Sequence, residues 1–566
     1  MIARLLLALA LLSVVVSSQQ EARFTYSDSA GTGTLNLTVT LSGGASYGVG
    51  IGFARVEIEN TCAQAQPVSV HLKPRRSDGD VQSMRSVVAE PGRSRFFLPM
   101  PVPPVQCLVE ASINGTTEKA YVNYSHANNI VSLFVSDRSG RASHGQRVLD
   151  LVPHLSFSGT TKSVPMGSED LPTDWRMLTS FSMIVIDGTT VAAAGMTSEL
   201  QDAIRRYAYS GGTVIVSAGD SMPMGSLRSL AAKALSRVLP YGLGHVIGIA
   251  RFESDRSGTE AVLAEVPLLG SGLWPATHDL FPVQDIAGLG KAPVTVFVLV
   301  ILAFAILVGP VNFVILHRRK KPLLALVTVP ILGFGTTIVI LAYGIFHDGF
   351  GVRGVVMSCT VLDQASHEAV SVNASTLFAG MAPSDMTMEP DSLVLSRRAS
   401  IDRSDWVDRW NWDANQQLLD GGILPSRTVT PLLAVQQGPM RERLTVRSSG
   451  DTLELLLDGG IEPVGEVVLC DLDGQHWSGR DGVLQRVSNA DGKRLFDGLR
   501  STASAARGQE QSTLRVPFGV PAWGQRGTYA TRVAKAPWLD DHGVSVDYDR
   551  EVHFVFGRMH AQDFVK

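Results

Sequence analysis

The chain has 566 residues, a formal net charge of −4 and four cysteines, and 45% of its residues are hydrophobic. This length gives room for three or four domains that each bury a core of their own. The small net charge, with its one dense basic cluster confined to His317–Lys321, excludes nucleic acid as an expected partner.

The N-terminus has the pattern of an export signal. Arg4 precedes an apolar run, Leu5–Val16, and small residues follow up to Ser18. The apolar run is too short to span a membrane, so residues 1–18 are predicted to be a cleaved signal peptide. The chain that follows is then expected outside the cytoplasm, in an oxidising compartment.

Residues 19–125 alternate apolar and polar side chains in short runs separated by turn residues, as in Gly50–Glu59 and Pro67–Leu72. This pattern predicts an immunoglobulin-like β-sandwich. Cys62 and Cys107 both fall in this domain, and an oxidising compartment favours a disulfide between them. The alternative is that all the cysteines are buried thiols.

Residues 126–290 change to an α/β pattern. Continuous apolar runs at Ile130–Val135, Met183–Asp187 and Thr213–Ser217 predict buried strands. Thr197–Tyr209 between the last two has an N-cap threonine and an apolar helical face. Strands and helix in this order predict a parallel sheet covered on both faces.

Three motifs of this region form a family pattern: Trp175-x-x-Leu178-x-x-Phe181 before a strand that ends in Asp187, and a helix that ends Tyr207-x-x-x-Gly211-Gly212. The pattern resembles the class I glutamine amidotransferase-like fold. In its exported, tethered form it is similar to uncharacterised bacterial two-span membrane proteins, in which this domain precedes a span ending Gly-Pro-x-Asn, here Gly309-Pro310-Val311-Asn312. The resemblance covers residues 125–350. It implies a catalytic cysteine with a histidine partner, but the chain has no cysteine between Cys107 and Cys359, so amidotransferase activity is not expected.

The carboxyl ends of the predicted parallel strands are the best place for a small ligand. The polar residues there are Asp137, Asp187, Asp220 and Ser221. Turn and helix-cap roles are the alternative. A hydrolase would use Ser221 as its nucleophile with His144 or His245 as base, although the Gly-x-Ser-x-Gly elbow is absent around Ser221.

Two uncharged apolar segments, Ala292–Leu316 and Pro322–Phe346, predict a transmembrane hairpin. Each would be roughly 37 Å long as a helix, enough to cross a hydrocarbon core of about 30 Å. The basic turn at residues 317–321 between them is expected in the cytoplasm. A hairpin buried in a soluble core is the alternative. Because neither span holds an ionisable residue, no ion path through this chain alone is expected.

Residues 350–566 return to a β pattern and predict one or two sandwich units on the same side of the membrane as the N-terminal part. Trp406, Trp410 and Trp412 lie in a stretch predicted as helix or loop, where they form a partner-binding platform or pack on the core. Alternation along Val544–Phe556 places His553 on a solvated strand face with three acidic residues, Asp547, Asp549 and Glu551, and Arg550 is the exception on the apolar face. Asp471-Leu472-Asp473-Gly474 is closer to a hairpin turn than to a calcium loop.

The fold class predicted is thus a multidomain membrane protein: β-sandwich, α/β domain, helical hairpin and C-terminal β region. The function predicted is non-enzymatic: an extracytoplasmic binding or scaffold protein of the bacterial cytoplasmic membrane, serving as accessory subunit of an envelope or membrane complex. The alternatives are a tethered hydrolase of an envelope polymer or peptide and an accessory subunit of a transporter. Neither a cofactor nor a metal site is predicted.

Overall fold

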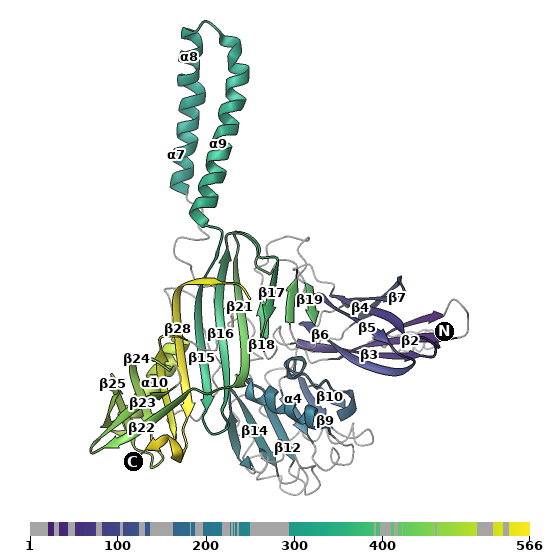
Figure 1. The fold of residues 1–566 in the computed structure, drawn as a ribbon, viewed down its shortest axis with the longest axis vertical. Coiled ribbons are helices and arrows are strands. Elements are labelled where there is room, and N and C mark those ends of the chain that lie inside the picture. The colour runs from purple at the N-terminus through teal and green to yellow at the C-terminus, as the bar shows by residue number, and fades with distance from the viewer. Residues whose placement is uncertain are drawn as a thin grey trace, which may run out of the picture.

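The computed structural model describes residues 21–27, 33–42, 51–74, 82–101, 106–123, 131–135, 162–181, 183–186, 196–217, 227, 230, 233–234, 237–249, 294–389, 392–396, 409–412, 417–420, 423–458, 461–505, 524–535 and 543–565. These residues form a mainly-β multidomain protein with four sheets and one long helical hairpin (Figure 1). The coarse architecture expected from the sequence is confirmed.

The N-terminal region is built from two antiparallel sheets that share a core. The first contains β1 (Glu21–Ser27), β2 (Thr34–Ser42), β3 (Ile51–Asn60) and β6 (Gly92–Pro101). The second contains β4 (Gln66–Pro74), β5 (Gln82–Ala89), β7 (Gln106–Ile113) and β8 (Thr116–Asn123). Every second residue of β2 is buried, and Leu37 and Val39 meet Val70 and Val109 of the other sheet in one cluster.

The second of these sheets is not confined to the N-terminal region. Three strands from far along the chain extend it beyond β5: β19 (Arg409–Trp412), β20 (Gln417–Asp420) and β17 (Asp385–Met388). β19 pairs in parallel with β5, with Trp410 opposite Ser83. This seven-stranded sheet, here called the shared sheet, therefore joins the parts before and after the membrane hairpin.

A six-stranded mixed sheet follows the sandwich. β10 (Lys162–Met166), β9 (Val131–Val135), β11 (Met183–Ile186), β12 (Thr213–Ser217) and β14 (Gly244–Ile249) run parallel, and β13 (Val238–Tyr241) is antiparallel at the edge. Helix α4 (Ser198–Tyr209) begins after Thr197, whose hydroxyl accepts a hydrogen bond from the Leu200 N–H at 3.3 Å. The apolar runs and the N-cap read from the sequence are thus in place.

Most strands of the C-terminal region form one twelve-stranded sheet, here called the large sheet. β15 (Val352–Asp363) and β16 (Glu368–Ala379) form a long antiparallel pair next to β21 (Val429–Pro439) and the edge strand β18 (Ser392–Ser396). On its other side β15 pairs in parallel with β28 (Val546–Arg558). The remaining strands, with helix α10 (Asn489–Ala505) packed on them, are β27 (Thr528–Val533), β24 (Pro463–Cys470), β25 (His476–Arg480), β26 (Val483–Val487), β23 (Thr452–Asp458), β22 (Arg443–Ser449) and β29 (Phe564–Val565).

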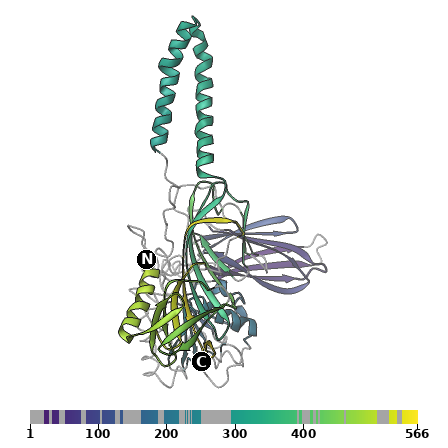
Figure 2. The ribbon, with the colours of Figure 1, turned by 60° about the vertical axis from the view of Figure 1, so that its left-hand side comes forward.

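The helical hairpin stands apart from the β regions. It comprises α7 (Val294–Ile306), a π-helical segment η5 (Leu307–Val311), α8 (Asn312–Arg318) and, after the basic turn, α9 (Ala325–Asp348). Its two candidate spans, Val296–Arg318 and Ala325–Tyr343, have mean hydropathies of 2.8 and 2.2, and no part of their most apolar windows is buried in the protein. Figures 1 and 2 show the basic turn at the tip, away from all the sheets. A hairpin buried in a soluble core is therefore wrong.

The π-helical segment coincides with a proline in the first span. Pro310 lacks the N–H that an α-helix needs, and the wider π turn accommodates it. Two residues after Pro310, Asn312 is only 8% exposed because it faces α9. The Asn312 amide donates to the Thr328 hydroxyl at 3.0 Å, and that hydroxyl lies 3.1 Å from Asn312 Oδ1. The polar side chain in the first span is therefore satisfied within the hairpin.

The sandwich, the mixed sheet and the large sheet pack into one body. A single hydrophobic cluster contains Phe53 of the sandwich, Phe181 and Tyr207 of the mixed-sheet region, and Leu377 and Phe554 of the large sheet. Hydrogen bonds follow the same contacts: the Ile51 N–H donates to Thr179 Oγ1 at 2.8 Å. The parts outside the hairpin are thus joined by core packing and not by linkers alone.

Candidate functional site

The sequence predicts a ligand site at the carboxyl ends of the parallel strands of the mixed sheet. β9, β11 and β12 are neighbours, and Ile186, the last residue of β11, pairs with Val135 of β9 and Val216 of β12. The strand ends from which the predicted site residues follow are therefore level and adjacent. The site residues themselves, Asp137, Asp187, Asp220 and Ser221, lie outside the described residues, as does His144.

His245, the other histidine predicted as a base for Ser221, lies near the amino-terminal end of its parallel strand. His245 is the second residue of β14 and pairs with Thr213, the first residue of β12. Ser217, where β12 ends, lies four residues farther along the strand, about 13 Å away. His245 is also 8% exposed. The strand register therefore places His245 at the opposite end of the parallel strands from Ser217.

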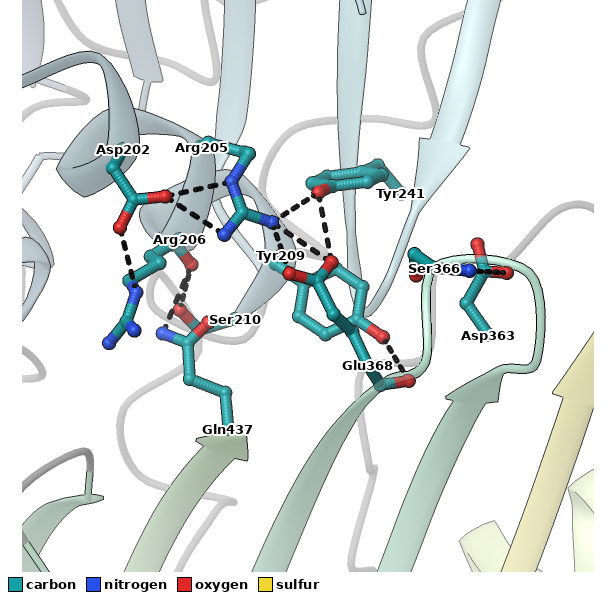
Figure 3. Close-up of polar contacts among 10 residues, drawn as sticks. All are labelled: Asp202, Arg205, Arg206, Tyr209, Ser210, Tyr241, Asp363, Ser366, Glu368 and Gln437. Carbon is teal, nitrogen blue, oxygen red and sulfur yellow. Dashed lines mark hydrogen bonds and ion pairs between the residues drawn. The ribbon is translucent and has the colours of Figure 1, made fainter. Parts of the chain in front are cut away.

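A cluster of polar side chains lies at the amino-terminal ends of the parallel strands of the mixed sheet, where it joins two parts of the described structure (Figure 3). Arg205 on α4 is at its centre. Its Nη1 donates to Glu368 Oε1 at 2.7 Å and to the Tyr241 hydroxyl at 2.8 Å, and its Nη2 donates to Asp202 Oδ1 at 2.9 Å. Glu368 is the first residue of β16, so this cluster connects the mixed sheet to the large sheet.

Two further contacts complete this junction. The Tyr209 hydroxyl donates to the backbone carbonyl of Glu368 at 2.9 Å. The Gln437 side chain of β21 donates to the Arg206 carbonyl at 3.4 Å, near the end of α4. The Tyr209 and Tyr241 rings also contact each other in a tilted arrangement, with ring centroids 5.0 Å apart. The junction is defined here as Asp202, Arg205, Tyr209, Tyr241, Glu368 and Gln437.

The ionisation of the junction keeps its charges fixed. Burial lowers the pKa of Arg205, but the neighbouring Tyr241, Glu368 and Asp202 outweigh this effect, and the guanidinium pKa lies above its ordinary value. Burial, together with Glu368 and against the opposing effect of Arg205, raises the pKa of Tyr241 to about 12. Burial likewise raises the pKa of Tyr209 well above its ordinary value. Arg205 is therefore a permanent cation held by internal partners, which suits domain attachment and not substrate binding.

A second polar chain lies on the large sheet, at a place the sequence did not indicate. Ser358 of β15 is opposite His553 of β28, and Ser358 Oγ lies 2.7 Å from His553 Nδ1. His553 Nε2 lies 3.0 Å from Glu551 Oε2. A carboxylate only accepts hydrogen bonds, so neutral His553 donates from Nε2 and accepts the Ser358 proton at Nδ1. The three residues follow the order of a serine–histidine–carboxylate triad, but the two imidazole nitrogens are exchanged, because in the triad the serine contacts Nε2 and the carboxylate Nδ1.

The burial of this chain limits what it can do. Ser358 is 1% exposed and His553 is fully buried, whereas the Glu551 side chain is 37% exposed. The prediction that His553 lies on a solvated face is therefore wrong. The cause is that both faces of β28 are covered from His553 onward, since Phe554 and Phe556 belong to one core cluster and Val555 belongs to another. Exposed and buried positions alternate only in the first part of this strand.

The other predicted sites change as follows. Trp410 and Trp412 belong to strand β19, so the prediction of helix or loop is wrong for them, and Trp406 lies outside the described residues. Cys62 and Cys107 are both buried and form no disulfide; the Cys107 thiol lies 3.7 Å from the Leu108 carbonyl oxygen. An oxidising compartment permits a disulfide only where the fold brings two thiols together, and each of these cysteines remains a free thiol.

The acidic sequence Asp471–Gly474 forms the turn between β24 and β25, as the hairpin interpretation predicted. Asp471 Oδ1 accepts the N–H groups of Asp473 and Gln475, and its Oδ2 accepts the Trp477 indole N–H at 2.8 Å. Its oxygens are thus used within the turn. Among the described residues, no group of three or more His, Cys, Asp and Glu side chains is placed to hold a metal ion.

Comparison with known proteins adds little. No family model and no curated protein matches the chain. The M1 zinc metallopeptidase of Deinococcus radiodurans is similar over 24% of this chain and 38% of its own, at 10% identity and a TM-score of 0.13. A β-glucosidase of Kluyveromyces marxianus is similar over 72% of this chain and 42% of its own, at 8% identity and a TM-score of 0.09. The chain thus spans less than half of either protein, and TM-scores this low carry no argument about fold or activity.

Proposed function

We propose that this chain is a non-enzymatic scaffold or binding protein anchored in the bacterial cytoplasmic membrane, with its sheets outside the cytoplasm, and that it serves as accessory subunit of an envelope or membrane complex. One observation carries the proposal. The sandwich, the mixed sheet and the large sheet contribute to one hydrophobic cluster, the shared sheet joins the sandwich to the C-terminal region, and the junction at Arg205 uses its polar groups internally. Such a construction favours a rigid platform over mobile catalytic lobes.

The orientation follows from the hairpin. The exposed basic turn, which includes Arg318, Arg319, Lys320 and Lys321, is at its tip, and all the sheets are at its base (Figure 2). Short basic loops stay in the cytoplasm. The predicted signal peptide places the N-terminal part on the opposite side, and the two arguments agree. Only a turn is then left in the cytoplasm, where it is too small to bind a nucleotide.

The finer fold assignments belong to the same proposal. We assign the mixed sheet to the class I glutamine amidotransferase-like fold, supported by its run of parallel strands and by α4 before β12. We assign the N-terminal sandwich to the immunoglobulin-like class, supported by its two packed antiparallel sheets. The absence of a cysteine between Cys107 and Cys359 removes the nucleophile of the first family.

The test is the composition of the complex in the native membrane. Amine-reactive crosslinking before solubilisation, followed by mild-detergent purification and mass spectrometry, should give a species heavier than one chain, with another membrane or envelope protein in fixed stoichiometry. A weakened junction, as in Arg205→Met, should reduce its yield more than Arg206→Ala does. A chain that purifies alone at monomer mass from crosslinked membranes would contradict the proposal.

The hydrolase alternative has one specific observation in its favour, the Ser358–His553–Glu551 chain. Its serine would have to become accessible, since it is 1% exposed. A fluorophosphonate probe distinguishes the two functions. The scaffold proposal expects no labelling of the native protein. Labelling that is lost in Ser358→Ala and kept in Ser375→Ala, another buried serine of the same sheet, would establish the hydrolase instead.

A further inference from the structure

We propose that the membrane-proximal end of the large sheet rests on the bilayer, with Phe350 and Met381 inserted among the headgroups and upper acyl chains of the leaflet on that side. The ligand is therefore the lipid of the membrane that the hairpin crosses. This inference rests on the proposed membrane anchoring and adds to it a second point of contact, made by a folded β region.

The first observation is that two large apolar side chains are exposed at the same end of the large sheet. Phe350 and Met381 are each 61% exposed, although both adjoin strands whose side chains are almost entirely buried. Phe350 lies in the link between α9 and β15, and Met381 lies in the loop that follows β16. An added Cβ at Gly380 would lie 2.1 Å from the Gly349 carbonyl oxygen, so link and loop are in direct contact. The two apolar side chains thus belong to one end of the sheet.

The second observation is that this end is held in shape. The Gly380 N–H donates to the Gly351 carbonyl at 3.0 Å, and the Ala382 N–H donates to Ser426 Oγ at 2.8 Å. The neighbouring Arg427 N–H donates to the Ala379 carbonyl at 2.7 Å. Backbone contacts on both sides of Met381 fix the loop, so its side chain is presented by a defined structure.

The third observation is depth. The helix that follows the basic turn runs from Pro322 through η6 and α9 to Asp348, which corresponds to about 39 Å at 1.5 Å per residue. A bilayer including its headgroup regions is about 40–45 Å thick. With the basic turn at one surface, Phe350 therefore reaches the headgroup region of the other. Figure 1 shows the β15–β16 end of the large sheet directly at the base of the hairpin.

The residue types fit that depth. Aromatic and large apolar side chains are favoured at the boundary between headgroups and acyl chains. Tyr343, at the end of the second span, is 38% exposed and belongs to the same belt. Arg427, which is exposed beside the Met381 loop, suits the phosphate layer just outside the apolar boundary. An apolar pair with an adjacent cation matches a phospholipid surface better than it matches water.

The experiment places a polarity-sensitive NBD fluorophore on single introduced cysteines in the full-length protein, reconstituted in phosphatidylethanolamine–phosphatidylglycerol vesicles. Three positions have similar exposure: Met381→Cys at the proposed contact, Ile338→Cys within α9, and Val483→Cys on β26 of the large sheet. The native cysteines are buried, so the unsubstituted protein labelled in parallel gives the background. Quenching is measured with brominated acyl chains and with aqueous iodide.

We expect brominated lipid to quench the probes at 338 and 381, with the deeper bromine positions acting on 338 and the shallow ones on 381. The probe at 483 should be quenched by iodide alone. If 338 is quenched by lipid while 381 is quenched only by iodide, the sheet contact is wrong and the membrane anchoring stands. If 338 is not quenched by lipid, the anchoring itself is wrong. Protection of 381 from both quenchers would mean that protein covers this end, which also overturns the inference.

Discussion

Arg205 Nη1 lies 2.7 Å from Glu368 Oε1, although the two residues are 163 positions apart and the membrane hairpin lies between them in the chain. The contact joins helix α4 of the mixed sheet to the first residue of β16. The mixed sheet is therefore attached to the end of the large sheet that lies away from the hairpin. The carboxyl ends of the parallel strands face away from this contact.

Replacing Arg205 with methionine should weaken the contact between the two sheets and lower the free energy of unfolding. The change keeps much of the side-chain volume but leaves the Glu368 and Asp202 carboxylates without their shared cation. Since the Arg205 side chain is 17% exposed, we expect a cost of about 2 kcal/mol, between that of a surface and a fully buried pair. Arg206→Ala, one position along, breaks a more exposed pair with Asp202 and should cost below about 0.5 kcal/mol. Denaturant unfolding in detergent measures both, and equal losses would contradict the role of the junction.

Gly242→Ala should disturb the junction through the backbone. Gly242 has φ +58° in the turn between β13 and β14, and an added Cβ would lie 2.3 Å from the Tyr209 carbonyl oxygen. Gly450 has a similar φ of +64° with open space around it. Gly450→Ala therefore measures the cost of the left-handed conformation alone, roughly 1 kcal/mol. A melting temperature lowered no further by Gly242→Ala than by Gly450→Ala would rule out the clash.

His553 should make the stability of the large sheet depend on pH. Burial lowers the His553 pKa from its ordinary 6.5, with Arg532 acting in the same direction, while Glu551 raises it by less. The unfolded chain then binds the proton more tightly than the folded one, so this contribution to stability is complete above about pH 6.5 and is lost as the pH falls from there toward the folded pKa. Melting temperatures at about pH 7.5 and 5 should differ more in the native protein than in His553→Gln.

Ser358→Ala provides the comparison for that measurement. It removes the Ser358 hydroxyl from His553 Nδ1 without removing a titrating group. We expect a loss of about 1 kcal/mol at pH 7.5, where neutral His553 needs a donor at Nδ1. If His553→Gln keeps the full pH dependence while Ser358→Ala is destabilising, the titrating group lies elsewhere.

The Asn312–Thr328 contact should couple the spans. In a double-mutant cycle with Asn312→Leu and Thr328→Val, we expect a coupling energy of about 0.6 kcal/mol, the mean found for hydrogen bonds between membrane helices, and not more than about 1.7 kcal/mol. Unfolding in mixed micelles measures the cycle. Thr337→Val serves as the control, because the Thr337 hydroxyl donates to the Gly333 carbonyl of its own helix. Its cycle with Asn312→Leu should give no coupling.

Membrane orientation can be read from cysteine labelling. Lys320→Cys in the basic turn should be protected from an impermeant maleimide in intact spheroplasts and labelled after lysis. Val483→Cys on the large sheet should be labelled in both. Labelling of Lys320→Cys alone in intact cells would reverse the topology.

Features encoded by local pattern could be predicted from the sequence. The apolar runs of β9, β11 and β12, the N-cap at Thr197 and the hairpin all follow from neighbours a few residues apart. The pairing of β19 with β5 does not, because no local pattern indicates which distant edge a short strand will join. For the same reason a single large sheet could not be distinguished from separate sandwiches.

The candidate sites also differ in how far they could be predicted from local sequence pattern. The parallel strands β9, β11 and β12 end level with one another, as the sequence predicted, whereas the site residues expected after them, Asp187 among them, lie outside the described residues. The Ser358–His553–Glu551 chain needed the register of β15 against β28, two strands from opposite ends of the C-terminal region. From His553 onward both faces of β28 are covered by core clusters, so the exposure of His553 could not be judged from the alternation along its own strand. Only the register between the two strands, and not the composition of either strand, shows that Ser358 and His553 meet.

The parallel pairing of β15 with β28 also has a consequence for biogenesis. Arg353 and Asp549, which form an ion pair across this seam, are 196 positions apart. When β15 has been synthesised it has one open edge, and β28, which covers this edge, follows only after all the intervening strands. Release of a truncated chain would leave that edge exposed beside the bilayer, where it can pair with a second copy. Late translocation failures should therefore produce membrane-bound aggregates and not soluble fragments.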